Sequence, residues 1–198
     1  MTRAELVQEV VDRGYDYVST ARIGRFVDTA YRRICSQRNW PFLEAEAQGA
    51  PPLELADLWK VLSVSANEHP LSPADRRWLV AAYPNLTDEG EPVFWYLENT
   101  TLKSYPVTSD EVAVRYRKRP TALADSEEPL IPEEFQDVIV DLAIVPCLKD
   151  DDEFQEAREL KLGEVKEGIQ EMAAALLGRN NQSAETVQRT GQPGDYLG

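Results

Sequence analysis

The chain has 198 residues, of which 35 are acidic and 21 basic, and its formal net charge is -14. A chain of this length buries about 70% of its unfolded surface, so one domain without disulfides or metal ions is expected. The acid excess argues against a surface that coats nucleic acid. No apolar run approaches the roughly 18 residues that span a membrane, and residues 1–5 hold no apolar signal region. We therefore expect a protein that folds in the cytoplasm.

Two helices are predicted at the start of the chain. Thr2 and Glu5 have the spacing of a capping box in front of a short apolar stripe. A second, longer helix is predicted over residues 20–38, because its apolar residues recur at three- and four-residue steps. Pro41 ends this segment, since the residue before a proline avoids the helical conformation.

The middle of the chain is predicted to be mostly β-structure. A short strand is expected in residues 42–47, and a short helix is expected to begin near Ser72. Four segments are predicted to be strands, because apolar and polar residues alternate in them or because they are rich in strand-forming residues. These segments are 59–65, 93–98, 101–105 and 111–119. Because consecutive strands usually pair, we expect these four to form a small antiparallel meander.

The last third is predicted to be helical and then to lose its pattern. From Pro132 the apolar period changes to that of a helix over 133–147, and a final helix is expected over 152–177. Residues 178–198 contain few apolar side chains, so alone they should be disordered. This tail is either a frayed end without a role or a docking peptide, whose candidate contact residues are Val187, Tyr196 and Leu197.

The predicted fold class is α+β and mainly helical. It consists of a bundle of N-terminal and two long C-terminal helices, with a small antiparallel β-meander inserted. The expected domain organisation is one domain over 1–177, with a helical core from 1–40 and 132–177 and a β-rich insert over 41–120. Residues 178–198 form the flexible tail.

Charge is distributed unevenly along the chain. Residues 21–38 hold five arginines and one aspartate, whereas 125–171 hold sixteen acids and four bases. This pattern is typical of two solvated helix faces, or of head-to-tail contact between the subunits of a ring. For the cations near 115–119, ion pairing across strands or between subunits is favoured over nucleic-acid binding. The candidate subunit contacts are Arg22, Arg25, Arg32, Arg115, Arg117, Asp150, Asp151 and Asp152.

The sequence contains no recognisable catalytic or metal-binding motif. His69 is the single histidine, and Cys35 and Cys147 lie in apolar helical stripes, where we expect buried thiols. No phosphate-binding glycine loop, HExxH or nucleophile elbow is present. The acids at 150–153 lack the spaced ligands of a calcium loop. We therefore expect no catalytic residue, metal ion or cofactor, and a protein that is not an enzyme.

Two short motifs carry a resemblance to a known family. The first is the run Arg38-Asn39-Trp40-Pro41-Phe42 at the end of the long N-terminal helix. The second is the spacing from Tyr116 through Arg119-Pro120 to Pro129-Leu130-Ile131-Pro132, followed by a helix, an acidic turn and a last helix. Over residues 3–177 this order resembles the head-to-tail adaptor (connector) proteins of tailed bacteriophages.

The resemblance implies a structural role in the virion, at the junction of head and tail, for a protein made in the cytoplasm of the bacterial host. Such adaptors form a ring, usually a dodecamer, beneath the portal protein. The ring extends the DNA channel without sequence-specific binding and contacts a downstream neck or tail protein, with no membrane involved. C-terminal segments in this family commonly dock on the portal. The alternatives are another neck or tail-terminator ring protein, and a protein-interaction module that is not part of a virion.

Overall fold

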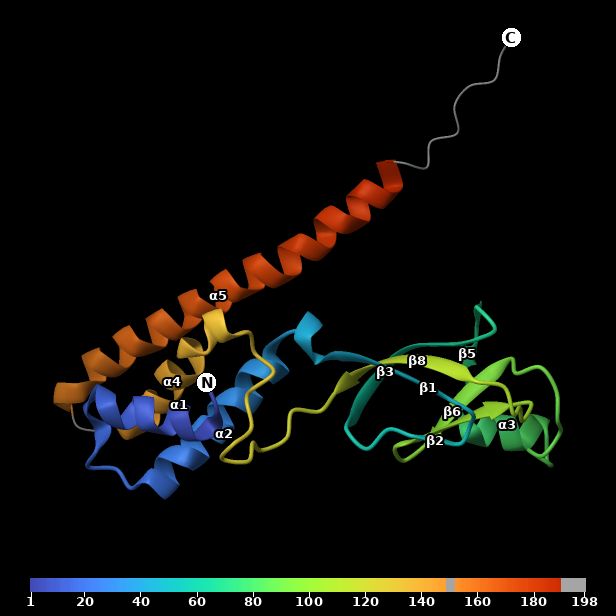
Figure 1. The fold of residues 1–198 in the computed structure, drawn as a ribbon, viewed down its shortest axis with the longest axis horizontal. Helices are drawn as coiled ribbons and strands as arrows, with labels where there is room; N and C mark the ends of the chain where they lie inside the picture. The colour runs from blue at the N-terminus through green and yellow to red at the C-terminus, as the bar shows by residue number, and fades with distance from the viewer. Residues whose placement is uncertain (149–151, 190–198) are drawn as a thin grey trace, which may run out of the picture. The chain divides into compact units, whose positions relative to one another are not determined.

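The computed structural model describes residues 1–148 and 152–189, with side chains throughout except at 152–153 and 179–189. Figure 1 shows the order of the elements along the chain. Within these described ranges, no helix combines the length and the apolar character that crossing a lipid bilayer requires.

The chain divides into two compact units. We call residues 1–42 together with 121–198 the helical unit, and Leu43–Pro120 the sheet unit. The helical unit is therefore built from both ends of the chain.

The helical unit consists of α-helices joined or extended by short 3-10 or π-helical turns. Its elements are α1 (Arg3–Val10), η1 (Val11–Tyr15), α2 (Thr20–Gln37), η3 (Glu133–Phe135), α4 (Asp137–Ile144), η4 (Val145–Cys147) and α5 (Asp152–Arg189). The short 3-10 turn η2 (Pro41–Leu43) includes the boundary between the two units.

Local chemistry explains where the first helices begin and end. The predicted capping box is confirmed, because Thr2 Oγ1 accepts from the Glu5 amide at 3.3 Å and Glu5 Oε2 accepts from the Thr2 amide at 2.7 Å. Gly14 adopts a φ of 96° inside η1, a conformation that glycine enters without steric cost. The predicted helix over 20–38 is confirmed as α2, and Trp40 follows it with its indole N–H donating to the carbonyl of Ile34 at 2.8 Å.

Helix α4 forms the centre of the helical unit. It packs against α1, α2 and α5, and its residues Val138, Ile139, Val140, Leu142, Ala143 and Ile144 are all buried. A helix that is apolar around most of its circumference is enclosed by neighbours. The helix expected over 133–147 is broken into η3, α4 and η4. Pro146 lies within η4, where its missing N–H cannot extend the α-helical ladder.

The sheet unit contains two four-stranded sheets and one helix. One sheet has the order β1-β8-β3-β4 and the other β2-β7-β6-β5. The element bounds are β1 (Glu44–Gly49), β2 (Leu53–Glu54), β3 (Leu58–Ala66), β4 (His69–Pro70), β5 (Ser72–Pro73), α3 (Arg76–Ala82), β6 (Phe94–Glu98), β7 (Thr101–Tyr105) and β8 (Val112–Lys118).

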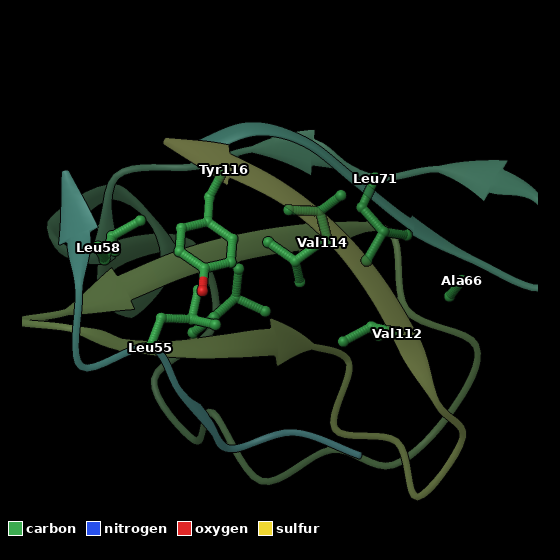
Figure 2. Packing of buried hydrophobic residues seen from close by; sticks show 9 residues of the cluster. Leu55, Leu58, Ala66, Leu71, Val112, Val114 and Tyr116 are labelled. Atoms are coloured by element: carbon green, nitrogen blue, oxygen red, sulfur yellow. The ribbon is translucent and has the colours of Figure 1, made fainter. Parts of the chain in front are cut away.

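The inner faces of the two sheets share a hydrophobic core, part of which is drawn in Figure 2. Val112, Val114 and Tyr116 alternate along β8 and point into this core. Leu102 of β7 belongs to the same core. The Tyr116 hydroxyl donates to Asp57 at 3.0 Å, which satisfies its polar end at the edge of the cluster.

The predicted fold class is wrong, because the chain is not a mainly helical bundle with one small meander. Of the strand pairs in the expected meander, β6 with β7 is observed, but β3 pairs with β8 and β8 also pairs with β1. Both of these pairs join strands that are distant in sequence, so the local turn signals that favour consecutive pairing do not reveal them.

Candidate interaction surfaces

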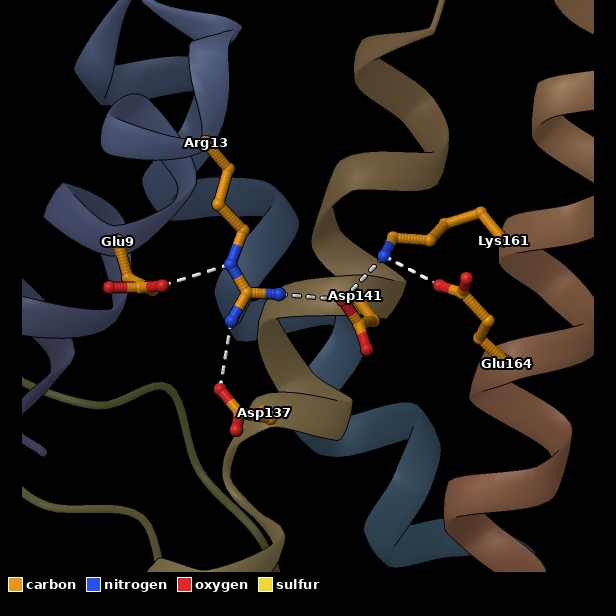
Figure 3. A network of polar contacts seen from close by, with 6 residues as sticks. All are labelled: Glu9, Arg13, Asp137, Asp141, Lys161 and Glu164. Carbon is orange, nitrogen blue, oxygen red and sulfur yellow. Dashed lines mark hydrogen bonds and ion pairs between the residues drawn. The ribbon is translucent and has the colours of Figure 1, made fainter.

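Arg13 connects the N-terminal helices to α4. Its guanidinium contacts Glu9 through Nε at 2.9 Å, Asp137 through Nη2 at 2.9 Å and Asp141 through Nη1 at 2.8 Å (Figure 3). The planar guanidinium can hold several carboxylates at once, which a lysine could not do in the same geometry.

Lys161 connects α5 to the same carboxylate of α4. Its ammonium lies 2.8 Å from Asp141 Oδ1 and 2.7 Å from Glu164 Oε2. Partial burial lowers the pKa of Lys161, but the hydrogen bonds to Asp141 and Glu164 outweigh it, so the pKa is raised. The same balance raises the pKa of Arg13, where burial is outweighed by Glu9 and by the charges of Asp141 and Asp137. Asp141 is thus the shared acceptor that ties three segments of the helical unit together.

A second ion pair, to Arg3, engages Asp28, which is the only acidic residue of α2 and is buried. Asp28 accepts two bonds from Arg3, from Nε and from Nη2, both at 3.0 Å. Gly24 makes room for this pair, because a Cβ there would lie 2.6 Å from Arg3 Nη2. Asp28 is consequently engaged on the inner side of α2 and does not neutralise the arginines on the outer side.

The outer face of α2 is basic. One face of α2 is formed by residues at steps of three or four, and all of them are exposed: Arg22, Arg25, Thr29, Arg32 and Ser36. We call the three arginines Arg22, Arg25 and Arg32 the α2 arginine row. Arg22 lies 5.4 Å from the Phe26 ring centroid, and Arg32 Nε donates to the Asp28 carbonyl. Among the described residues, no carboxylate forms an ion pair with this row.

The outer face of α5 is acidic. We call Glu156, Glu167 and Glu171 the α5 acidic row, and all three are exposed on the side opposite the buried Val165 and Met172. None of the three forms an ion pair with another described residue. Leu160 lies on the same face and is 67% exposed, the largest exposed fraction among the large hydrophobic residues described.

Two glycines of α5 differ in their surroundings. A Cβ at Gly168 would lie 2.7 Å from Val138 Cγ2, so this glycine permits the close approach of α5 to α4. A Cβ at Gly163 would meet nothing within 4 Å. Glycine in a helix interior costs roughly 1 kcal/mol relative to alanine, and at Gly163 no contact of the subunit itself explains that cost.

The arginines of β8 lie in a different setting. Arg115 contacts Glu44 at 3.1 Å and Glu46 at 3.4 Å, and Arg117 contacts Glu44 at 3.7 Å, all across the β1–β8 pair. These are the cross-strand ion pairs that the sequence left open as one alternative for Arg115 and Arg117. They link carboxylates and arginines of the same subunit.

The remaining sequence-predicted contact residues fall at the limits of the described structure. Asp150, Asp151, Tyr196 and Leu197 lie outside the described residues. Asp152 begins α5 and Val187 lies near its end, but their side chains are not among those described. Helix α5 itself continues to Arg189, past Gly178, where the apolar pattern of the sequence stops.

The two thiols lie in the core of the helical unit. Cys35 and Cys147 are free and buried, as expected from their positions in apolar stripes. Burial raises the pKa of Cys35 to about 12, although a hydrogen bond with Tyr31 opposes part of the shift. A thiol in this setting is a poor nucleophile. In the ranges that the structure describes, no group of three or more His, Cys, Asp or Glu side chains is arranged to hold a metal ion.

Two surface features of the structure were not predicted from the sequence. One is an aromatic cluster at α3, whose Trp78 is 51% exposed. The Trp78 ring centroid lies 5.5 Å from that of Phe94 and 6.3 Å from that of Tyr83. The other is a groove of about 270 Å³ in the helical unit with an apolar floor and basic rim, lined by Arg33, Gln37, Arg38, Leu142, Leu162, Val165, Lys166, Ile169 and Gln170. Tertiary packing creates both features, and local periodicity gives no signal for either.

No curated protein sequence matches the chain. The family model described as SU10 adaptor protein matches residues 1–192, which is nearly the whole chain and includes both units. The chain therefore belongs to the SU10 adaptor protein family of bacteriophage adaptors, which confirms the family that the sequence predicted.

Proposed function

We propose that this chain is the subunit of a ring that lies beneath the portal of a filled bacteriophage capsid. The ring extends the DNA channel and joins the capsid to the neck or tail. Membership of an adaptor family supports a structural role in a bacteriophage. The ring is proposed to be a dodecamer, the usual form in the family that the sequence resembles.

Helix α5 is the observation that carries the proposal. Among the described side chains of α5, which end at Gly178, the buried ones are Val165, Ile169, Met172 and Ala173, and the helix continues to Arg189. At about 1.5 Å per residue, the part beyond Ala173 adds roughly 24 Å. Figure 1 traces α5 well past its contact with α4. An arm of this length can reach a partner outside the helical unit.

We assign the portal contact to this arm and to the residues beyond it. Val187, Tyr196 and Leu197 supply apolar and aromatic groups in a segment that is otherwise polar. Short segments that order on a partner commonly use a few such anchors. The net charge of -14 supports a channel through which DNA passes without adhering, because acidic surfaces repel phosphates.

The test is a binding assay between the chain and the purified portal of the same phage. We expect a chain shortened after Leu177 to lose only the helical circular dichroism of residues 178–189 and to keep the thermal unfolding of its folded units. Its portal affinity should fall at least about tenfold. A full-length Tyr196→Ala, Leu197→Ala variant should lose part of the affinity without any loss of helix. Undiminished portal binding by the shortened chain would contradict the docking role.

A further inference from the structure

We propose that the α2 arginine row of one copy packs along the α5 acidic row of the next copy, and that this contact joins neighbouring subunits. The inference rests on the proposed function in that it requires several copies in one ring. It adds the two helix faces that meet and the residues on each of them.

Charge is the first argument for this pairing. Arg22, Arg25 and Arg32 cover about 15 Å of helix, and Glu156 to Glu171 cover about 22 Å, at 1.5 Å per residue. Neither row has an ion-pair partner among the described residues of its own subunit. Two exposed helix faces of similar length and opposite charge are therefore available to each other in separate copies.

The centre of the acidic row gives a second, independent argument. Leu160 and Gly163 lie between Glu156 and Glu167 on the outer face of α5. Leu160 is 67% exposed, and a Cβ at Gly163 would meet nothing within 4 Å. An exposed leucine beside a glycine that the subunit does not need forms an apolar patch that a second helix can approach closely. Acids on both sides of this patch would form the polar rim of the contact.

The placement of the two rows is compatible with a closed ring. Both rows belong to the helical unit, and the inner faces of α2 and α5 both pack on α4. In a ring, each copy offers its α2 row to one neighbour and its α5 row to the other, so every pair of copies leaves one face of each kind free and further copies add in the same direction until the ring closes. A two-fold dimer with one self-complementary patch would not have this property.

The contact is expected to be salt-sensitive. Exposed ion pairs are weak individually and are screened over about 8 Å at physiological ionic strength. Subunits held at a common platform assemble at a far higher effective concentration than free ones. We therefore expect assembly to weaken steeply with added salt and to strengthen on the portal.

The experiment uses two charge-reversed variants of the full chain. The first is Arg25→Glu with Arg32→Glu, and the second is Glu167→Arg with Glu171→Arg. Each variant alone places like charges across the proposed contact, so we expect at least about a tenfold rise in the protein concentration needed for assembly. In an equimolar mixture every contact joins opposite charges again, so assembly should return, with alternating copies in the ring.

Assembly is measured by sedimentation velocity and native mass spectrometry at low salt, with and without portal. Circular dichroism confirms that each variant is folded. Glu133→Arg with Glu134→Arg is the matched control for the second variant, because it changes the net charge by the same amount and sign at exposed acids outside the acidic row. It should assemble like the unaltered chain. If the unaltered chain forms no ring with or without portal, the proposed function fails. If it does form rings but both variants assemble normally, or the mixture is not rescued, the α2–α5 contact is overturned and the proposed function stands.

Discussion

The arginines of β8 face the carboxylates of β1, whereas the arginines of α2 face solvent. Arg115 and Arg117 are paired with Glu44 across a strand pair, while Arg25 and Arg32 have no carboxylate partner among the described residues. The sheet unit thus pairs the arginines of β8 internally, whereas the helical unit has a basic face and an acidic face without an ion pair among the described residues. An adaptor of this construction would use the helical unit for contacts between copies.

The largest effect on the helical unit is expected from emptying its core. Ile139 is completely buried in α4, and Ile139→Ala should lower the free energy of unfolding by about 2–5 kcal/mol. Val114→Ala in β8 removes fewer carbon atoms from the sheet-unit core and should cost less. Urea denaturation, together with hydrogen exchange of α4 and β8 amides, measures both. A loss below about 1 kcal/mol for Ile139→Ala would contradict the central position of α4.

The next largest effect is expected from removing ion pairs, and it should be larger in the helical unit than in the sheet unit. Asp141→Asn removes the charge shared by Arg13 and Lys161, and should destabilise the protein by about 1.5–3 kcal/mol, because both cations are only partly exposed. Glu44→Gln weakens pairs whose main partner, Arg115, is 58% exposed, so about 0–1 kcal/mol is expected. Equal losses in chemical denaturation would remove this distinction between the units.

The pH dependence of the free energy of unfolding tests the helical unit alone, because both thiols of the chain belong to it. Burial raises the pKa of Cys35 from 9.0 to about 12, so the unfolded state loses its proton first. The contribution of the Cys35 proton to the free energy of unfolding is complete below pH 9. Between pH 9 and about 12 this contribution is lost, and the free energy of unfolding falls by up to about 1.4 kcal/mol per pH unit. Cys35→Ala should flatten this slope in urea denaturations from pH 8 to 11. An unchanged slope would exclude Cys35 as the cause.

The smallest effects come from the two glycines of α5, measured under conditions where the protein is not assembled. Gly163→Ala should stabilise the subunit by up to about 1 kcal/mol, since alanine favours the helix and its methyl group meets nothing. Gly168→Ala should destabilise it, because the new Cβ would lie 2.7 Å from Val138. Thermal unfolding of both variants gives the sign of each change, and the same sign for both would argue against the different roles assigned to them.

Local sequence signals were sufficient for the elements whose causes are local. The capping box of Thr2 and Glu5, helix α2 and the β6–β7 hairpin follow from spacing, periodicity and a turn. The pairing of β3 with β8 was not predictable in this way, because Ser65 meets Ala113 only once the chain has folded. The error in fold class follows from such long-range pairings, which join β8 to both β1 and β3 and leave β6 and β7 in a second sheet.

The same distinction explains what the sequence could say about the candidate surfaces. It identified Arg22, Arg25 and Arg32 as a basic group, because helical spacing alone puts them on one face. It could not tell that Asp28 binds Arg3, which it does across 25 residues of sequence. Nor could it decide between the two alternatives for Arg115, whose partner Glu44 comes from a strand 71 residues earlier.

The most direct test of the account is covalent trapping of neighbouring subunits in assembled protein. Thr29→Cys at the middle of the α2 arginine row is combined in turn with Glu156→Cys, Gly163→Cys and Ala174→Cys along the outer face of α5. Under mild oxidation, we predict that at least one double variant gives a ladder of disulfide-linked oligomers on a non-reducing gel, while the corresponding single variants do not. Assembled rings that yield no ladder from any of the three pairs would contradict contact between α2 and α5 of adjacent copies.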